Sequence, residues 1–84
     1  MFINKGAGGR NNLSGLVIGR LRKERKWSQR MLADQMQLLG IDIDKNAVQR
    51  IEAGQRFVTD IELKVFAECL NVTADALLRE EEQL

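Results

Sequence analysis

The chain has 84 residues, enough for one domain with a modest core. Hydrophobic residues make up 44% and charged residues 30%, as in ordinary globular domains, and no apolar run is long enough to cross a bilayer. The single cysteine, Cys69, cannot form an intrachain disulfide, and without histidine it makes neither a zinc site nor a Cys/His nucleophile pair. We therefore expect no catalytic residues, metal or cofactor. Residues 1–12 lack the apolar stretch of a secretory signal, which favours a cytoplasmic protein.

The net charge of +1 hides a strong asymmetry along the chain. Residues 1–30 hold eight Lys or Arg against Glu24 alone, whereas residues 31–84 hold five against eleven acidic residues. Such asymmetry is typical of a protein that meets a polyanion with one face. Alternatively, the basic segment from Arg20 to Lys26 is only the solvated face of one helix. Charge alone does not decide between these interpretations.

The first thirty residues predict an arm followed by a helix. Residues 1–12 contain three glycines, Gly6, Gly8 and Gly9, and are expected to be a flexible arm before a domain over residues 13–79. Ser14 is a candidate N-cap for a first helix that reaches about Arg25. Leu13 and Ile18 are spaced as a hydrophobic staple across that cap.

Two further helices follow in quick succession. Ser28 is a candidate N-cap for the second helix, which ends at Gly40 and has a buried stripe made of Leu32, Ala33, Met36 and Leu39. Asp44 is a candidate N-cap for a third helix, about residues 45–53, which Gly54 stops. At about 100° per residue, this third helix has two unlike sides. Its polar arc carries Lys45, Asn46, Gln49, Arg50 and Ala53, and its apolar arc carries Ala47, Val48 and Ile51.

The last third predicts two helices and a tail. Thr59 and Glu62 have the spacing of a capping box for a fourth helix, whose inner face is Leu63, Phe66, Ala67 and Leu70, with Cys69 at its margin. Asn71 is a candidate stop, and Thr73 opens a fifth helix that carries Leu77 and Leu78. Residues 80–84 are expected to be an acidic tail. Since prolines are absent and strand patterns are scarce, the fold class is predicted to be all-α.

An ordered set of segments resembles the lambda repressor-like (Cro/cI, Xre-type) helix-turn-helix family. The segments are Arg20–Gln29, Leu32–Ala33, Val48–Arg56 and Ala67–Thr73, and the resemblance covers about residues 16–78. It implies a compact five-helix bundle with the helix-turn-helix at the second and third helices. The chain departs from the family by about five extra residues between Ala33 and Ile43. It also carries Arg30 in the first turn of the second helix, where many relatives have acidic residues. This cation either meets a phosphate or extends into solvent.

The resemblance implies that the third helix enters the major groove of double-stranded DNA. The candidate base-reading residues are Lys45, Asn46, Gln49 and Arg50, because Asn can bond adenine and Arg can bond guanine through two hydrogen bonds, while Lys serves guanine or a phosphate. The candidate phosphate contacts are Gln29, Arg30, Gln55 and Arg56. Arg22 and Glu52 are expected to form a structural ion pair between the first and third helices. The alternative is that the polar arc merely solvates an exposed helix.

Three functions stay open at this stage. The first is a transcriptional regulator, a repressor that occupies an operator as a homodimer on an inverted repeat. The fifth helix, with Leu77 and Leu78, is the candidate dimer interface, although these leucines can instead complete the core of the monomer. The second is an antitoxin that binds operator DNA and a toxin protein. The third is a protein-interaction module with the same fold. No enzyme and no membrane protein is expected.

Overall fold

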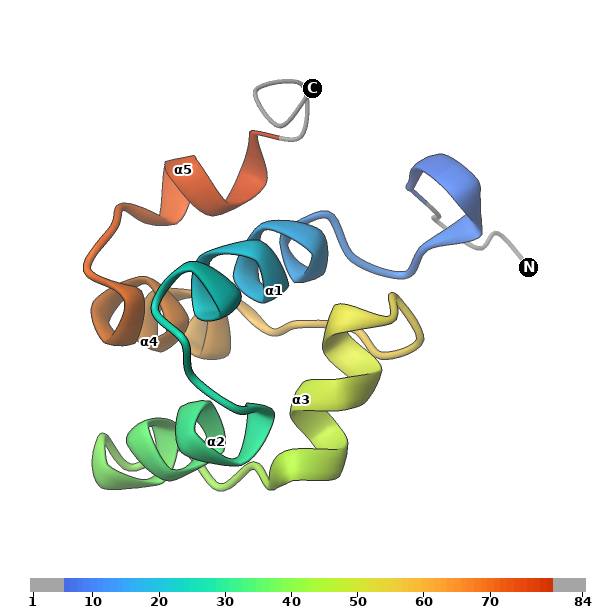
Figure 1. Cartoon of the computed structure of the whole chain (residues 1–84). Coiled ribbons are helices and arrows are strands. Elements are labelled where there is room, and N and C mark those ends of the chain that lie inside the picture. Colours follow the sequence, from blue (N-terminus) through green and yellow to red (C-terminus); the bar gives the residue numbers. More distant parts are fainter. Residues whose placement is uncertain (1–5, 80–84) are drawn as a thin grey trace.

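The computed structural model describes residues 6–79. The predicted tail, residues 80–84, and the first five residues of the predicted arm lie outside the described residues. This part contains five α-helices, a short 3-10 turn and no strand, so the all-α prediction is confirmed. The elements are η1 (Ala7–Gly9), α1 (Ser14–Glu24), α2 (Gln29–Leu38), α3 (Lys45–Glu52), α4 (Asp60–Leu70) and α5 (Ala74–Leu78) (Figure 1).

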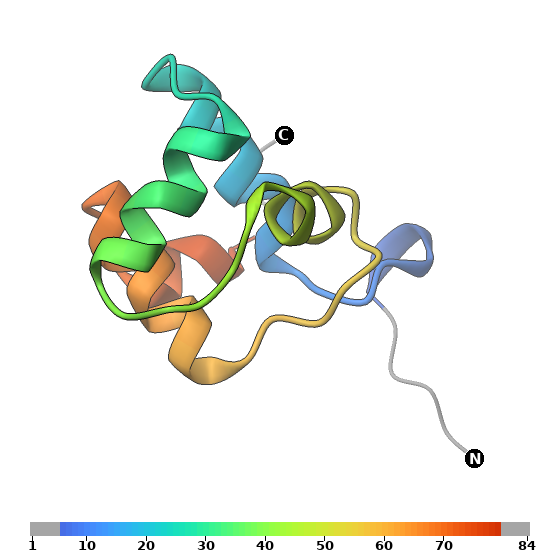
Figure 2. The same ribbon diagram turned by 90° about the horizontal axis from the view of Figure 1, so that it is seen from below.

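Helix α1 lies at the centre of the bundle. It packs against α3, α4 and α5, while α2 packs against α3 and α4. Helices α2 and α3 lie on the side of the molecule opposite α5, and both face the viewer from below (Figures 1 and 2). All five helices contribute to one core, whose fully buried large side chains are Ile18, Leu32, Met36, Ile51, Phe66, Leu70 and Leu77. The core therefore fixes α2 and α3 from behind.

The start of α1 differs from the prediction. Ser14 is buried within the first turn and does not cap the helix. The side chain of Asn12 takes that role, because its Oδ1 accepts a hydrogen bond of 2.8 Å from the amide of Gly15. Leu13 already has helical dihedral angles and is 39% exposed, whereas Ile18 is fully buried. The predicted cap and its hydrophobic staple are therefore wrong by two residues.

The other predicted helix caps are present. Ser28, Asp44, Thr59 and Thr73 each accept a hydrogen bond from the amide three residues further on, at 3.0, 2.8, 3.1 and 3.1 Å. Caps of this kind stabilise a helix by about 1 kcal/mol each. Asn71, with φ of 57°, ends α4 as predicted. The starts of α2, α3, α4 and α5 thus follow from local side-chain chemistry.

The long connection from α2 to α3 is anchored at both ends. After Leu38 the chain turns through Gly40, and the amide of Ile41 donates to the carbonyl of Met36 at 3.0 Å. Ile43 is buried, and Gln37 Nε2 donates to its carbonyl at 2.8 Å. Leu39, predicted as part of the buried stripe, is 49% exposed because the helix ends before it and the turn carries it outward.

Candidate nucleic-acid interface

One side of α3 is exposed and polar. Ala47, Val48 and Ile51 are buried against the bundle, which leaves the opposite face of the helix in solvent. This face carries the four predicted base-reading residues, Lys45, Asn46, Gln49 and Arg50, all exposed. None of these four side chains has a hydrogen-bond or ion-pair partner within residues 6–79. The face is therefore open to an external partner.

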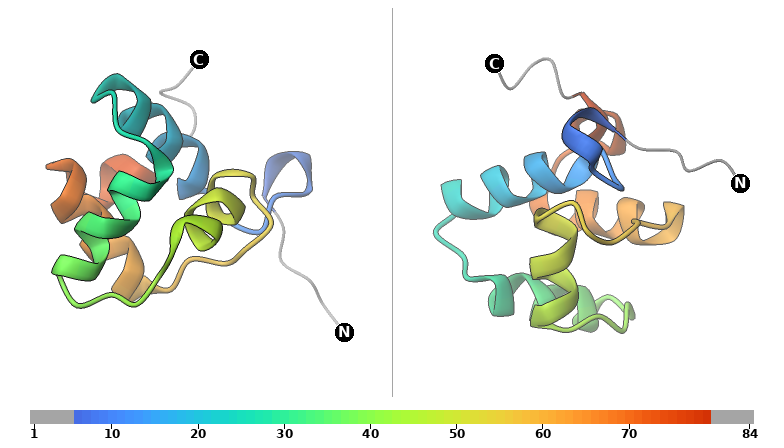
Figure 3. Two further views of the ribbon diagram at one scale, coloured as in Figure 1. Left: turned by 60° about the horizontal axis from the view of Figure 1, so that its bottom comes forward. Right: turned by 90° about the vertical axis from the view of Figure 1, so that its right-hand side faces the viewer.

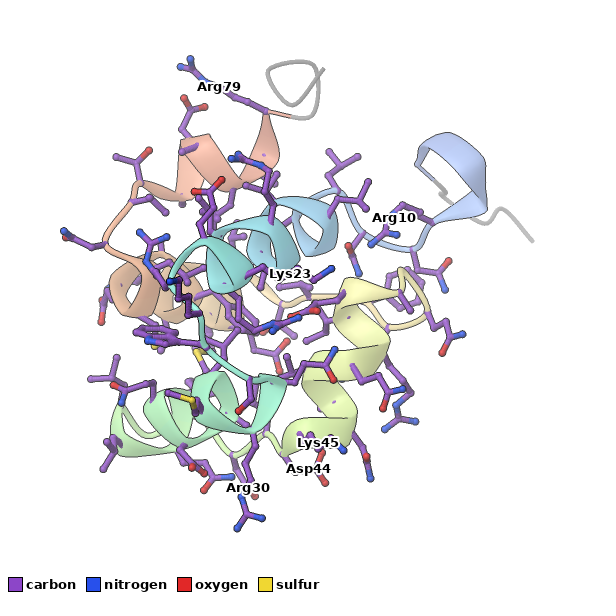
Figure 4. The ribbon with its side chains drawn as sticks, viewed as in Figure 1. Arg10, Lys23, Arg30, Asp44, Lys45 and Arg79 are labelled. Carbon is purple, nitrogen blue, oxygen red and sulfur yellow. The ribbon has the colours of Figure 1, made fainter. Side chains whose placement is uncertain are left out.

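The exposed residues of α3 fall into two groups. Asn46, Gln49 and Arg50 line a shallow hollow together with Ala53 and Gln55. Lys45 lies apart from them, in a groove between α2 and α3 that Arg30, Asp34 and Asp44 also line. Figure 4 shows Arg30, Asp44 and Lys45 near one another at one end of the molecule. The structure thus brings Gln55 to the base-reading candidates and Lys45 to the phosphate candidate Arg30.

The predicted ion pair between Arg22 and Glu52 is present, and the side chain of Gln29 also binds the Glu52 carboxylate. Arg22 donates from Nε and Nη2 to the two carboxylate oxygens of Glu52, at 2.7 and 2.9 Å. These hydrogen bonds raise the pKa of Arg22 above its ordinary value. Gln29 Nε2 donates to Oε1 of the same carboxylate at 3.1 Å. The side chain of Gln29, predicted to approach a phosphate, is therefore held inside the domain, and only its backbone amide remains for that role.

Arg56 has a structural partner that the sequence analysis missed. Its Nη1 and Nη2 donate to Oε1 and Oε2 of Glu62, at 3.0 and 2.9 Å. Glu62 is buried, and its capping-box bond to the amide of Thr59 turns the carboxylate back toward the loop. Arg56 lowers the pKa of Glu62. The guanidinium of Arg56, predicted to contact a phosphate, is thus held in a half-buried ion pair within the domain. The Thr59–Glu62 box was the local signal for it.

Three residues before α1 bind the end of α3, where the sequence predicted a flexible arm. We call Arg10, Asn11 and Asn12 the N-terminal strap. Asn12 Nδ2 donates to the carbonyls of Ile51 and Arg56, at 3.0 and 2.7 Å. Arg10 and Asn11 bind further carbonyls of the same segment, so the chain at these residues is held rather than free. The glycines just before the strap led to the prediction of a flexible arm, and no local pattern indicated this contact.

The basic charge of the first thirty residues reaches the surface only in part. Arg10, Arg22 and Arg25 all use their guanidinium groups inside the domain, Arg25 on the carbonyls of Leu21 and Leu70. Arg20 pairs with Glu24 along α1 at 2.9 Å. Within residues 6–79, the exposed cations without a described partner are Lys23, Lys26, Arg30, Lys45, Arg50 and Lys64. Three of them, Arg30, Lys45 and Arg50, lie on or beside the exposed face of α3.

The comparisons with known proteins agree with this geometry. The family model described as helix-turn-helix matches residues 18–77, which cover α2, α3 and α4 and most of α1 and α5. The chain belongs to the Cro/cI-type (Xre) helix-turn-helix family, whose domains bind DNA and are not catalytic. No curated protein matches the chain. Among residues 6–79, no helix is long and apolar enough to span a bilayer.

Proposed function

We propose that the protein is a transcriptional repressor that occupies an operator and reads its major groove with α3. The observation that carries this proposal is the exposed, unpartnered polar face of α3, held from behind by Ala47, Val48 and Ile51. The major groove of B-DNA is wide enough to admit an α-helix, and it distinguishes all four base pairs. Membership of the helix-turn-helix family supports the same use of this face.

The two groups of residues on this side receive different roles. Asn46, Gln49 and Arg50 are the base readers, because amide and guanidinium groups form paired hydrogen bonds with adenine and guanine. Lys45 and Arg30 hold the phosphate backbone, since both line the groove between α2 and α3. Gln55, with its exposed side chain, and the backbone amide of Gln29 complete the backbone contacts.

The proposal includes a homodimer on an inverted repeat, because one helix reads only a few base pairs. Two α3 helices would then lie about 34 Å apart, one turn of the duplex. Of the candidate interface on α5, Leu77 is fully buried in the core and is unsuited to the role, whereas Leu78 is 42% exposed. Phe57, in the loop between α3 and α4, and Ile61, in the first turn of α4, are 61% and 65% exposed. We assign the dimer contact to these two residues.

Charge on α4 supports a second copy as the occupant of this face. Asp60 and Lys64 are exposed and have no described partner within residues 6–79. They lie one turn apart on α4, along the flank of the helix next to Ile61. A two-fold packing of α4 against α4 of a second copy, centred near Ile61, sets Asp60 of each chain near Lys64 of the other.

The test is selection of bound duplexes from a random-sequence pool, followed by footprinting of the enriched sequence. We expect an enriched inverted repeat whose half-sites are protected together. Absence of any enriched sequence would reject the regulator and favour a protein-interaction module. A single unrepeated half-site, fully protected at saturation, would reject the dimer and keep the DNA-binding function.

A further inference from the structure

We propose that the N-terminal strap is a positioning device that sets the sequence discrimination of α3. The strap lies outside residues 18–77, so the family match does not account for it. Arg10, Asn11 and Asn12 hold α3 and the loop after it at a fixed rotation and height, and they do so without touching DNA themselves. The inference rests on the proposed function, and it assigns a role to residues that the function has not used.

The strap binds almost every carbonyl from the end of α3 through the following loop. Arg10 Nη2 donates to the carbonyl of Glu52 at 2.8 Å and approaches that of Ile51 at 3.4 Å. Asn11 donates from its amide to Gly54 at 2.8 Å and from Nδ2 to Gln55 at 3.2 Å. Together with the Asn12 bonds to Ile51 and Arg56, these contacts satisfy the carbonyls that a helix end leaves open.

Asn12 joins three elements through one side chain. Its Oδ1 accepts from the amide of Gly15 and caps α1, while its Nδ2 donates to Ile51 at the end of α3 and to Arg56 in the loop. The amide group therefore fixes the distance between the start of α1 and the end of α3. Since α1 lies at the centre of the bundle, Asn12 gives α3 a second attachment to the core, in addition to the packing of its own buried face.

Two glycines make room for the strap. A Cβ at Gly15 would lie 2.1 Å from the carbonyl oxygen of Ile51, and a Cβ at Gly54 would lie 2.8 Å from Cζ of Arg10. Gly54 also has a φ of +79°, which favours glycine. Figure 4 shows Arg10 between the N-terminal segment and the end of α3, and Figure 3 shows the ribbon of the two segments from two further sides. The strap is thus a close-packed contact and not a loose covering.

The end of α3 is held from two sides. Glu52 offers its carboxylate to Arg22 and its carbonyl to Arg10. Arg50 and Gln55, which line the reading hollow, lie two and three residues from this clamp. A binding constellation works only when its groups are held to within about 0.5 Å. A loosened clamp therefore degrades base reading first, while phosphate contacts from Arg30 and Lys45 at the other end of α3 persist.

The experiment compares Arg10→Ala and Asn12→Ser with Arg79→Ala as a control. Asn12→Ser keeps an oxygen for the α1 cap and loses both donors to the α3 end, and Arg79 is an exposed cation on the opposite side that pairs with Asp75. Affinity is measured for the selected duplex and for a scrambled duplex of equal length, across a salt series. Amide hydrogen exchange at residues 53–55 is measured in the free protein.

We expect the ratio of specific to nonspecific affinity to fall about tenfold in both strap variants, the loss of one good base contact. The salt slope should stay unchanged, exchange at residues 53–55 should accelerate, and Arg79→Ala should change none of these. A salt slope shallower by about 0.9 in Arg10→Ala, with nonspecific affinity lowered in step, would make Arg10 a phosphate contact and overturn the proposal.

The failure of the strap can be told apart from the failure of the proposed function. Unchanged discrimination and unchanged exchange in both variants overturn the strap alone. A wild-type chain with no preferred duplex overturns the proposed function, and with it the role of the strap in discrimination. In that case accelerated exchange in the variants would still show that Arg10 and Asn12 hold the end of α3. Arg10→Lys provides a further check, because restored charge rescues a phosphate contact but not the paired carbonyl bonds of Nη2.

Discussion

Arg22 and Glu52 meet through two hydrogen bonds between α1 and α3, with 9% and 11% of their side chains exposed. Because both charges are buried, removal of one leaves the other without its partner. We expect Glu52→Ala to lower the free energy of unfolding by about 3–5 kcal/mol. The matched control is Glu24→Ala, which breaks the exposed pair with Arg20 and should cost less than about 1 kcal/mol. Chemical denaturation of both variants decides, and equal losses would contradict the prediction.

Arg56→Ala tests whether this residue serves the fold or the DNA. Since Arg56 binds Glu62 inside the domain, we expect the variant to lose about 1–3 kcal/mol of stability by leaving the carboxylate unpaired. The salt dependence of DNA binding should not change. A stable variant with a salt slope shallower by about 0.9 would instead show that Arg56 contacts a phosphate, as expected from the sequence.

Glu62 should also make stability depend on acid pH. Its pKa is lowered in the folded state, chiefly by the hydrogen bonds from Arg56. The unfolded chain therefore binds a proton at higher pH than the folded chain does. The stabilisation is complete above the unfolded pKa of about 4.3 and is lost as pH falls through the lower folded value. Denaturation of wild type and Glu62→Gln between pH 7 and pH 3 should give curves that converge at acid pH; a constant gap between them would count against this account.

Reading and positioning residues on the DNA face should fail differently. Asn46→Ala and Arg50→Ala should each cost about 1–3 kcal/mol on the preferred duplex and relax the preference at one base pair. Arg30→Ala and Lys45→Ala should weaken all duplexes alike, with salt slopes shallower by about 0.9 each. All four side chains are exposed, so stability should change by less than about 0.5 kcal/mol. If the selected sequence stays the same in both Asn46→Ala and Arg50→Ala, α3 is not the reader.

The dimer contact can be separated from the core by a pair of substitutions. Ile61→Glu should leave stability nearly unchanged, because Ile61 is 65% exposed. On the inverted repeat, however, this variant should occupy only one of the two half-sites. Leu77→Ala should destabilise the monomer by about 2–5 kcal/mol, as expected for a fully buried leucine. Native mass spectrometry of complexes with full and half operators gives the stoichiometry. A two-to-one complex that survives Ile61→Glu would move the interface elsewhere.

Local signals made most helices predictable from the sequence. The caps at Ser28, Asp44, Thr59 and Thr73 each involve an amide three residues away, so the pattern is complete within one short window. The Arg22–Glu52 pair spans 30 residues and became predictable only through the family resemblance.

Long-range contacts outside that resemblance were not predictable. The bond from Arg10 to Glu52 joins residues 42 apart, and no local pattern announces it. Gln29 and Arg56 were assigned to phosphate because they are polar and lie at helix ends, while the carboxylates that bind them come from α3 and α4. Residue type and position indicated that these side chains form polar contacts. Which groups they contact depends on how the helices pack.

The hydrogen bonds described from the strap to the α3 end all run to main-chain carbonyls, from Ile51 to Arg56. Such bonds do not depend on which side chains those carbonyls belong to. Asn46, Gln49, Arg50 and Gln55 can therefore be varied without loosening the attachment of the helix, provided that Gly54 is kept. The residues that attach α3 to the bundle and the residues proposed to contact bases are in different parts of the chain. A library randomised at these four exposed positions should therefore yield folded variants with new operator preferences.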